Sequence, residues 1–102
     1  MTTYQILYWH DIPVQVRAGG RRDRFSVELP ERFQAAVDSA AMAAGLAETD
    51  EYLAGFHWSE PAEQDGTAPE VAAAVASALQ AAYAIIDWRA TAEKARAARS
   101  FQ

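Results

Sequence analysis

The sequence predicts an α+β domain: a small antiparallel sheet of about three strands, then two shorter helices and one long Ala-rich C-terminal helix. Short runs rich in Val, Ile, Tyr, Phe and Trp fill residues 1–29, and from residue 30 apolar residues recur at spacings of three and four. A chain of 102 residues with 51% hydrophobic content is sufficient for one core. We therefore expect a single domain over residues 1–90.

Three strands are expected over residues 4–9, 13–18 and 24–29. The third run alternates cleanly, with Phe25, Val27 and Leu29 on one face. Glycines 19 and 20 lie between the second and third runs and permit a tight antiparallel hairpin. The first run, YQILYW, is apolar on both faces, so its second face needs either a covering helix or a partner.

The first helix is expected to begin after Pro30 and to end at Gly45, which can adopt the left-handed conformation of a helix C-cap. Thr49 and Asp50 can cap a short second helix over residues 50–58. A polar segment, residues 59–66, reads as a loop. The expected core comprises Ile6, Tyr8, Phe25, Val27, Leu29, Phe33 and Val37.

The long third helix is expected to begin at the capping-box sequence Thr67-Ala68-Pro69-Glu70 and to continue past residue 86. Beyond Trp88 the only large apolar residue is Phe101. We therefore expect the basic end, residues 91–102, to fray for want of an apolar anchor.

The charge is unevenly distributed along the chain. Residues 1–87 carry a net charge of −8 and residues 88–102 carry +3, which gives −5 in total. The acidic majority does not favour nucleic acid as a partner. There is no cysteine, no visible secretory signal and no membrane-spanning stretch, so we expect a cytoplasmic protein without membrane contact.

His10 and Asp11 follow the first strand, where a His beside a carboxylate could act as a base or metal ligand, whereas Asp11 before Ile12-Pro13 is also a typical turn residue. Catalytic zinc requires three protein ligands, however, and His57 stands in no ligand spacing with His10. The chain also lacks a Cys nucleophile and a Gly-x-Ser-x-Gly elbow. We therefore predict no catalytic residue, metal or cofactor, while a small enzyme or metal-binding protein that uses His10 stays open as an alternative.

A nucleic-acid-binding alternative comes from the order of elements. Residues 24–56 read as strand, helix, glycine and capped helix, which resembles a ribbon-helix-helix regulator. In that family the strand pairs with the same strand of a second chain and enters the major groove. Glu28 on the outward face would oppose phosphate binding, so this reading ranks second.

Three stretches resemble a known family: Trp9-His10-Asp11-Ile12-Pro13, Leu29-Pro30-Glu31-Arg32-Phe33 and the join at residues 50–53. Over about residues 4–58 they are similar to the small bacterial domain family named "virulence factor". The resemblance implies no settled activity and no catalytic residue. We predict first a non-catalytic bacterial accessory or interaction protein, and the resemblance implies an association with one-carbon (folate or corrinoid) metabolism.

A partner surface is predicted where charged residues meet the second face of the first strand. We expect the long helix to cover Leu7 and to leave Trp9 and Arg17 at its rim, because aromatic and Arg side chains often anchor interfaces. The arginines of the hairpin could hold an anion. The predicted partner-binding residues are Trp9, His10, Asp11, Arg17, Arg21 and Arg22. The partner is expected to be an unknown protein, and homodimerisation remains open.

Overall fold

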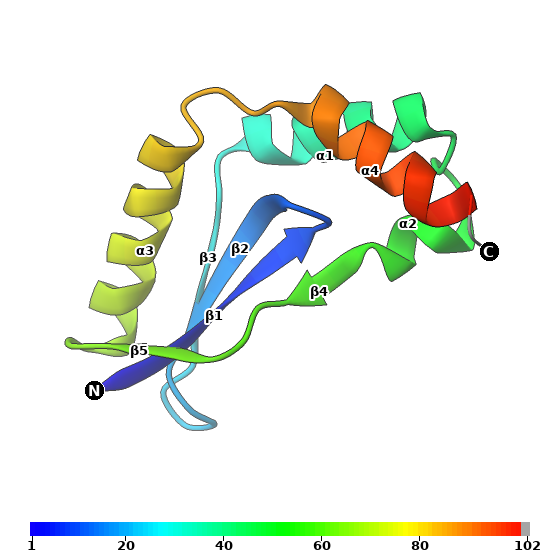
Figure 1. The fold of residues 1–102 in the computed structure, drawn as a ribbon. Coiled ribbons are helices and arrows are strands. Elements are labelled where there is room, and N and C mark those ends of the chain that lie inside the picture. Colours follow the sequence, from blue (N-terminus) through cyan, green and yellow to red (C-terminus); the bar gives the residue numbers. More distant parts are fainter. Residues whose placement is uncertain (101–102) are drawn as a thin grey trace.

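The computed structural model describes the backbone of residues 1–100 and the side chains of residues 1–98. The chain folds into an antiparallel sheet with helices along one face and one end (Figure 1), which confirms the α+β class. The elements in chain order are β1 (Thr2–Trp9), β2 (Ile12–Ala18), β3 (Phe25–Glu28), α1 (Glu31–Ala44), α2 (Asp50–Ala54), β4 (Phe56–Trp58), β5 (Ala62–Gln64), α3 (Ala68–Ala82) and α4 (Trp88–Ser100).

The three predicted strands form as expected, and β2 lies between β1 and β3. The described sheet has five strands rather than about three, because β4 and β5 both pair with the other edge of β1. Sequence analysis placed residues 56–58 at the end of a helix and residues 62–64 in a loop. That placement is wrong.

Pairing with β1 explains these two extra strands. α2 ends at Ala54, and the following residues Phe56 and Trp58 carry aromatic side chains that suit a pleated strand. Ser59 then binds Ile6 twice: its N–H donates to the Ile6 carbonyl at 2.8 Å, and its hydroxyl accepts from the Ile6 N–H at 2.8 Å. The edge of β1 thus pairs with short segments whose local sequence pattern does not predict a strand.

α1 forms as predicted. Gly45 adopts the left-handed conformation with φ of 74°, and Leu46 N–H donates to the Ala41 carbonyl at 2.8 Å. Phe33 and Val37 are fully buried on its inner face. The predicted cap therefore fixes where the helix stops and turns Leu46 back into the core.

The predicted single long C-terminal helix is instead two helices. The capping box at Thr67 and Glu70 is present as expected, but α3 stops at Ala82, and Asp87 begins α4 by accepting from the Ala90 N–H at 3.2 Å. Arg32 of α1 holds the end of α3, because its guanidinium donates to the carbonyls of Tyr83 and Gln80. A tertiary contact thus satisfies carbonyls that a continuing helix would have used itself.

α4 lies along α1 (Figure 1). Thr91, Ala92 and Ala95 are each only 2% exposed. The expectation of fraying assumed that this end has no apolar anchor. That assumption is wrong over the described residues, because Ala92 and Ala95 are buried and alanines pack closely between helices. Whether the end frays stays a prediction. Phe101, in the predicted tail, lies outside the described residues.

The core agrees with the sequence analysis in part. Leu29, Phe33 and Val37 are buried, and Ile6 and Val27 pack against them half-buried. Phe25 is 42% exposed, and Tyr8 is only half-buried. The largest fully buried side chain is Trp9, which we had expected at a rim.

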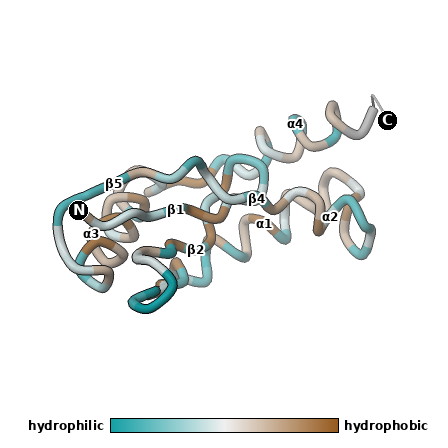
Figure 2. The backbone as a smooth tube through the Cα atoms, turned by 90° about the horizontal axis from the view of Figure 1, so that it is seen from below, coloured by the Kyte–Doolittle hydropathy of each residue, from teal (hydrophilic) through white to brown (hydrophobic). Residues whose placement is uncertain are grey.

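α3 covers the opposite face of the sheet from the one predicted. Its residues Val71 and Val75 join the core cluster with Val16 of β2, whereas Leu7 is not part of that cluster. Along the chain, the turn between β2 and β3 is strongly hydrophilic, whereas much of α3 is hydrophobic (Figure 2). No helix of the described chain is long and apolar enough to cross a membrane.

Candidate functional site

The tight turn between β1 and β2 holds Trp9, His10 and Asp11. His10 has a positive φ of 54°, and its N–H donates to the Gly55 carbonyl at 3.0 Å. Trp9 is fully buried, and its indole N–H donates to the Tyr52 carbonyl at 2.8 Å. Trp9 therefore supports the fold and cannot contact a partner directly, which corrects the expectation that it lies at a rim.

His10 lies half-buried beside a pocket of about 350 Å3 between α2 and α4, which Asp50 and Ala95 also line. Burial lowers the pKa of His10, although the charge of Asp11 acts in the opposite direction. Partial burial thus favours the neutral imidazole, which lies edge-on to Trp9 with 4.4 Å between ring centroids.

Asp11 is engaged by α4 rather than by His10. Its carboxylate accepts hydrogen bonds from the Thr91 hydroxyl and, at 2.8 Å, from the Lys94 ammonium. Partial burial acts to raise the pKa of Asp11, but these hydrogen bonds outweigh it and hold the pKa below its usual range. The sequence neighbours His10 and Asp11 therefore do not form an acid–base pair.

No metal site is formed by the described residues: no group of three or more His, Asp or Glu side chains among them could hold an ion. His57, on β4, stacks against Tyr8 with 5.9 Å between ring centroids. Both histidines thus pack against aromatic rings: His10 against Trp9 and His57 against Tyr8.

Arg17 belongs to the face of the sheet opposite α3. Strand register places Gln5 opposite Arg17 and Leu7 opposite both Gln15 and Trp58. We call this side the open face, and it consists of Gln5, Leu7, Gln15, Arg17, Ser26, Glu28 and Trp58.

Two contacts hold Arg17 in place on the open face. Its guanidinium donates to the Gln5 side-chain oxygen at 2.9 Å and lies 3.9 Å from the centre of the Trp58 ring. Trp58 is the functional candidate that sequence analysis missed, because it was assigned to the end of a helix. Its alternation with Phe56 is the signal that could have identified it.

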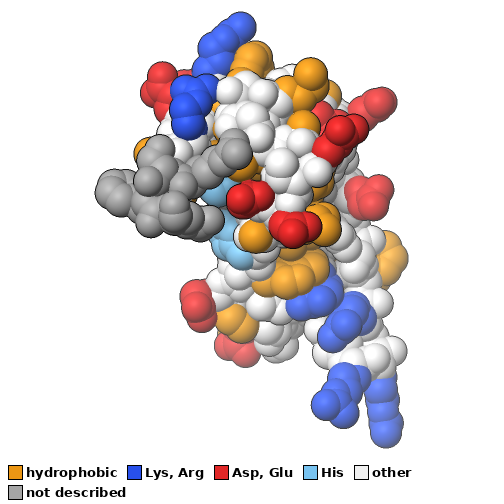
Figure 3. Space-filling view, turned by 90° about the vertical axis from the view of Figure 1, so that its right-hand side faces the viewer, with side chains coloured by type: hydrophobic (Ala, Val, Ile, Leu, Met, Phe, Trp, Pro, Cys, Tyr) orange, Lys and Arg blue, Asp and Glu red, His pale blue; other side chains and the backbone are white. Residues whose placement is uncertain are grey.

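A groove of about 440 Å3 lies between the open face and the first turns of α1. Its apolar lining is Leu7, Val14, Leu29 and Phe56. Its polar lining is Gln15, Glu28, Glu31 and Gln34. Seen from the right of Figure 1, hydrophobic side chains in the middle of the molecule adjoin Lys and Arg side chains that extend down to its lower end (Figure 3).

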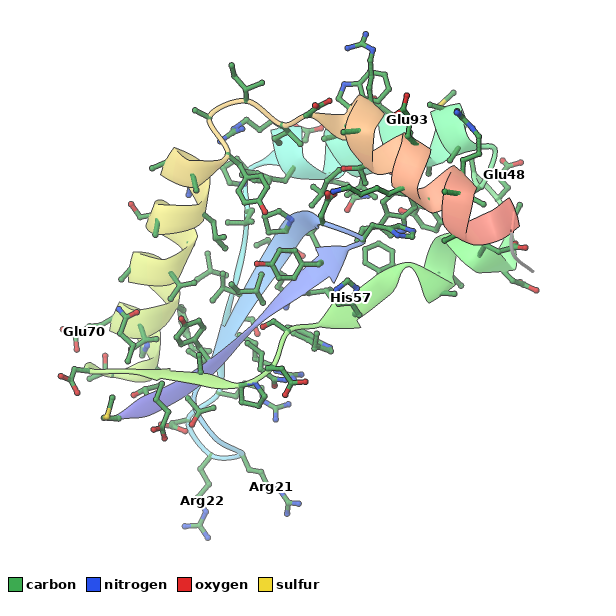
Figure 4. All side chains as sticks on the ribbon, in the orientation of Figure 1. Arg21, Arg22, Glu48, His57, Glu70 and Glu93 are labelled. Carbon is green, nitrogen blue, oxygen red and sulfur yellow. The ribbon has the colours of Figure 1, made fainter. Side chains whose placement is uncertain are left out.

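Arg21 and Arg22 lie at the tip of the β2–β3 hairpin, directed away from the body and far from His57 (Figure 4). Both are exposed, as is Arg24. The six predicted partner-binding residues thus separate into three places: the β1–β2 turn, the open face with Arg17, and the hairpin tip. Only Arg17 and the tip share one side with the groove.

The model of a protein family described as "virulence factor" matches residues 7–87. The chain belongs to the virulence factor family. The match confirms the predicted resemblance and extends it beyond residue 58 to the end of the α3–α4 connection. No curated protein and no solved structure was similar enough to match.

The virulence factor motifs are mostly structural here. Trp9, Ile12, Leu29 and Phe33 are buried, and Arg32 holds the end of α3. Asp11 lies within the family match, whereas its partners Thr91 and Lys94 lie beyond it. The open face and its groove lie largely within the matched residues.

Proposed function

We propose that this virulence factor family member is a non-catalytic accessory protein that binds a partner protein through its open face. The observation that carries the proposal is the groove of about 440 Å3 beside half-exposed Leu7, Phe56 and Trp58, on the face that α3 leaves uncovered. Half-exposed apolar and aromatic side chains beside a fixed arginine have the composition of a binding surface.

The positions of the titratable groups support a non-catalytic role. The Asp11 carboxylate binds α4, and His10 forms no ion pair with a carboxylate among the described residues. The ribbon-helix-helix alternative gains no support, because β3 pairs with β2 of the same chain. Cytoplasmic location and the association with one-carbon metabolism stay predictions, since no contact among the described residues bears on them.

The test places a photo-crosslinking amino acid at Gln15 on the open face and, as a matched control, at the exposed Ala74 on α3. In native cells, position 15 should trap one recurrent protein that position 74 does not. The trapped protein, once purified, should bind the wild-type chain in calorimetry.

Two variants test the surface itself. Arg17→Glu and Ser26→Glu should each abolish binding of the purified partner while the melting temperature stays close to wild type. Ser26 is exposed, so its replacement leaves the core untouched. Equal trapping from positions 15 and 74, or undiminished binding by both folded variants, would place the contact surface elsewhere.

A further inference from the structure

The β2–β3 hairpin has a defined geometry. Gly19 has φ of 91°, and its N–H donates to the Thr3 carbonyl at 2.9 Å. The Asp23 carboxylate accepts from the Gly20 N–H at 2.7 Å and so closes the turn. The hairpin therefore presents its arginines from a formed turn, which reduces the ordering cost of binding.

This hairpin is basic on an acidic molecule. Residues 17–24 carry four arginines and one aspartate, a net charge of +3, so the rest of the chain carries −8. Arg21, Arg22 and Arg24 make no ion pair or hydrogen bond with any described residue. They are free to bind an anionic group.

The basic tip is continuous with the groove. Arg17, stacked on Trp58, stands between the hairpin tip and the apolar lining around Leu7. Glu28 and Glu31 form an acidic side of the groove, and strand register places Gln15 between Glu28 and Leu7, so the acidic and the apolar lining lie side by side. The surface therefore combines a positive hairpin with a groove that is apolar on one side and acidic on the other.

We propose that the partner presents a short polypeptide segment of matching polarity, with carboxylates on the hairpin arginines and an apolar side chain in the groove. A lysine, arginine or amide of the segment then meets Glu28 and Glu31. This inference rests on the proposed function and names the chemistry of its partner. Charge complementarity of this kind fixes the direction in which a segment binds.

A polypeptide fits this surface better than a nucleic acid does. A phosphate backbone carries charge along its whole length, so it would place negative charge against Glu28, Glu31 and the acidic remainder of the molecule. A peptide can carry its acidic residues at one end only. The acidic side of the groove thus favours a peptide over a nucleic acid.

The direct test uses a labelled peptide with a run of glutamates, then leucine and tryptophan, then lysines, and follows its binding by fluorescence anisotropy. The control peptide keeps the composition in shuffled order. The ordered peptide should bind more tightly, and raising the ionic strength to about 0.15 M should weaken it, as for any exposed charge pairing.

The decisive variant replaces Arg21, Arg22 and Arg24 by glutamine. A matched control places glutamates at Ala73, Ala74 and Ala78, which are exposed on α3, so both variants lower the net charge by three. The hairpin variant should bind the peptide about tenfold more weakly and with a smaller salt dependence, while the α3 variant should bind nearly as wild type.

Several outcomes would overturn the inference. Equal weakening by both variants would show a general effect of net charge, and equal binding of ordered and shuffled peptides would show no directional surface. Tighter binding of a single-stranded oligonucleotide would point to nucleic acid, and concentration-dependent dimerisation abolished by the hairpin variant would point to a second copy. If the partner trapped at position 15 binds the hairpin variant normally, this inference fails while the proposed function stands.

Discussion

Lys94 donates a hydrogen bond to the carboxylate of Asp11 at 2.8 Å, across 83 positions of sequence. Thr91, one helical turn earlier in α4, donates to the other oxygen of the same carboxylate. One aspartate in the turn after β1 thus holds the last helix against the rest of the fold. This contact gives Asp11 a structural role in this chain.

Removal of this carboxylate should loosen α4. Asp11→Ala should lower the free energy of unfolding by about 1 kcal/mol, because it deletes two hydrogen bonds to a partly exposed group. Lys94→Ala should cost less, since Thr91 keeps its bond. Denaturant unfolding measures both, and amide exchange should speed up in α4 but not in β2. A larger loss in Lys94→Ala than in Asp11→Ala would contradict this assignment.

Stability should fall in acid partly through Asp11. Its pKa is lowered on folding from an ordinary value of 3.8, so its contribution is full above that value and disappears as the pH falls through the folded pKa. Glu70, whose pKa is also lowered by its capping bonds to Thr67, acts in the same direction. Asp11→Asn should therefore show a smaller loss of stability than wild type between neutral and acidic pH. If the stabilities of Asp11→Asn and the wild type fell equally with decreasing pH, Asp11 would not contribute to the loss of stability in acid.

Burial of α4 against α1 predicts a contrast between neighbouring alanines. Ala92→Glu should cost more than about 2 kcal/mol, because it buries a charge at a position that is 2% exposed. Ala97→Glu, on the exposed side, should change stability by less than about 0.5 kcal/mol. Thermal unfolding of both variants decides the point. Equal, small effects would show that this end of the chain frays after all.

The close contact between Gly55 and Trp9 gives a sharp steric prediction. A Cβ at Gly55 would lie 2.5 Å from the indole nitrogen of Trp9, so Gly55→Ala should destabilise the protein by about 1–3 kcal/mol. Gly20→Ala is the matched control, because its nearest atom would be 3.6 Å away. Denaturant midpoints compare the two. A harmless Gly55→Ala would mean that the Trp9 ring shifts freely, contrary to its complete burial.

The surroundings of His10 predict no transition-metal site. Zinc titration followed by calorimetry should show only nonspecific binding, because the imidazole has no set of converging ligands among the described residues. A micromolar site that His10→Ala abolishes would contradict this and would revive the metal-binding alternative.

Local patterns identified most elements of the fold. The alternation of Phe25, Val27 and Leu29 with polar residues, the glycine at 45 and the capping box at 67–70 each fix an element through its own backbone preferences. These signals act within a few residues, so a single sequence contains them in full. The family resemblance, too, was readable from short motifs.

Patterns could not show which distant segment completes each element. Phe56-His57-Trp58 becomes a strand because the edge of β1 is available, and α3 ends where Arg32 binds its last carbonyls. Which face of the sheet α3 covers also depends on contacts between segments that are distant in the sequence. The two faces of β1 are both apolar, so periodicity alone gave no reason to prefer Val16 and its neighbours over Leu7.

The sequence by itself determined the α+β class, the first three strands, α1 with its cap, the start of α3 and the family, because short-range backbone preferences and motifs encode them. Tertiary structure alone decided that Trp9 is core, that Asp11 binds α4 and not His10, and that Arg17 joins Trp58 beside a groove. Each of these features depends on contacts between side chains that are tens of residues apart in the sequence. That choice follows from packing the whole chain into one core, and no local pattern contains it.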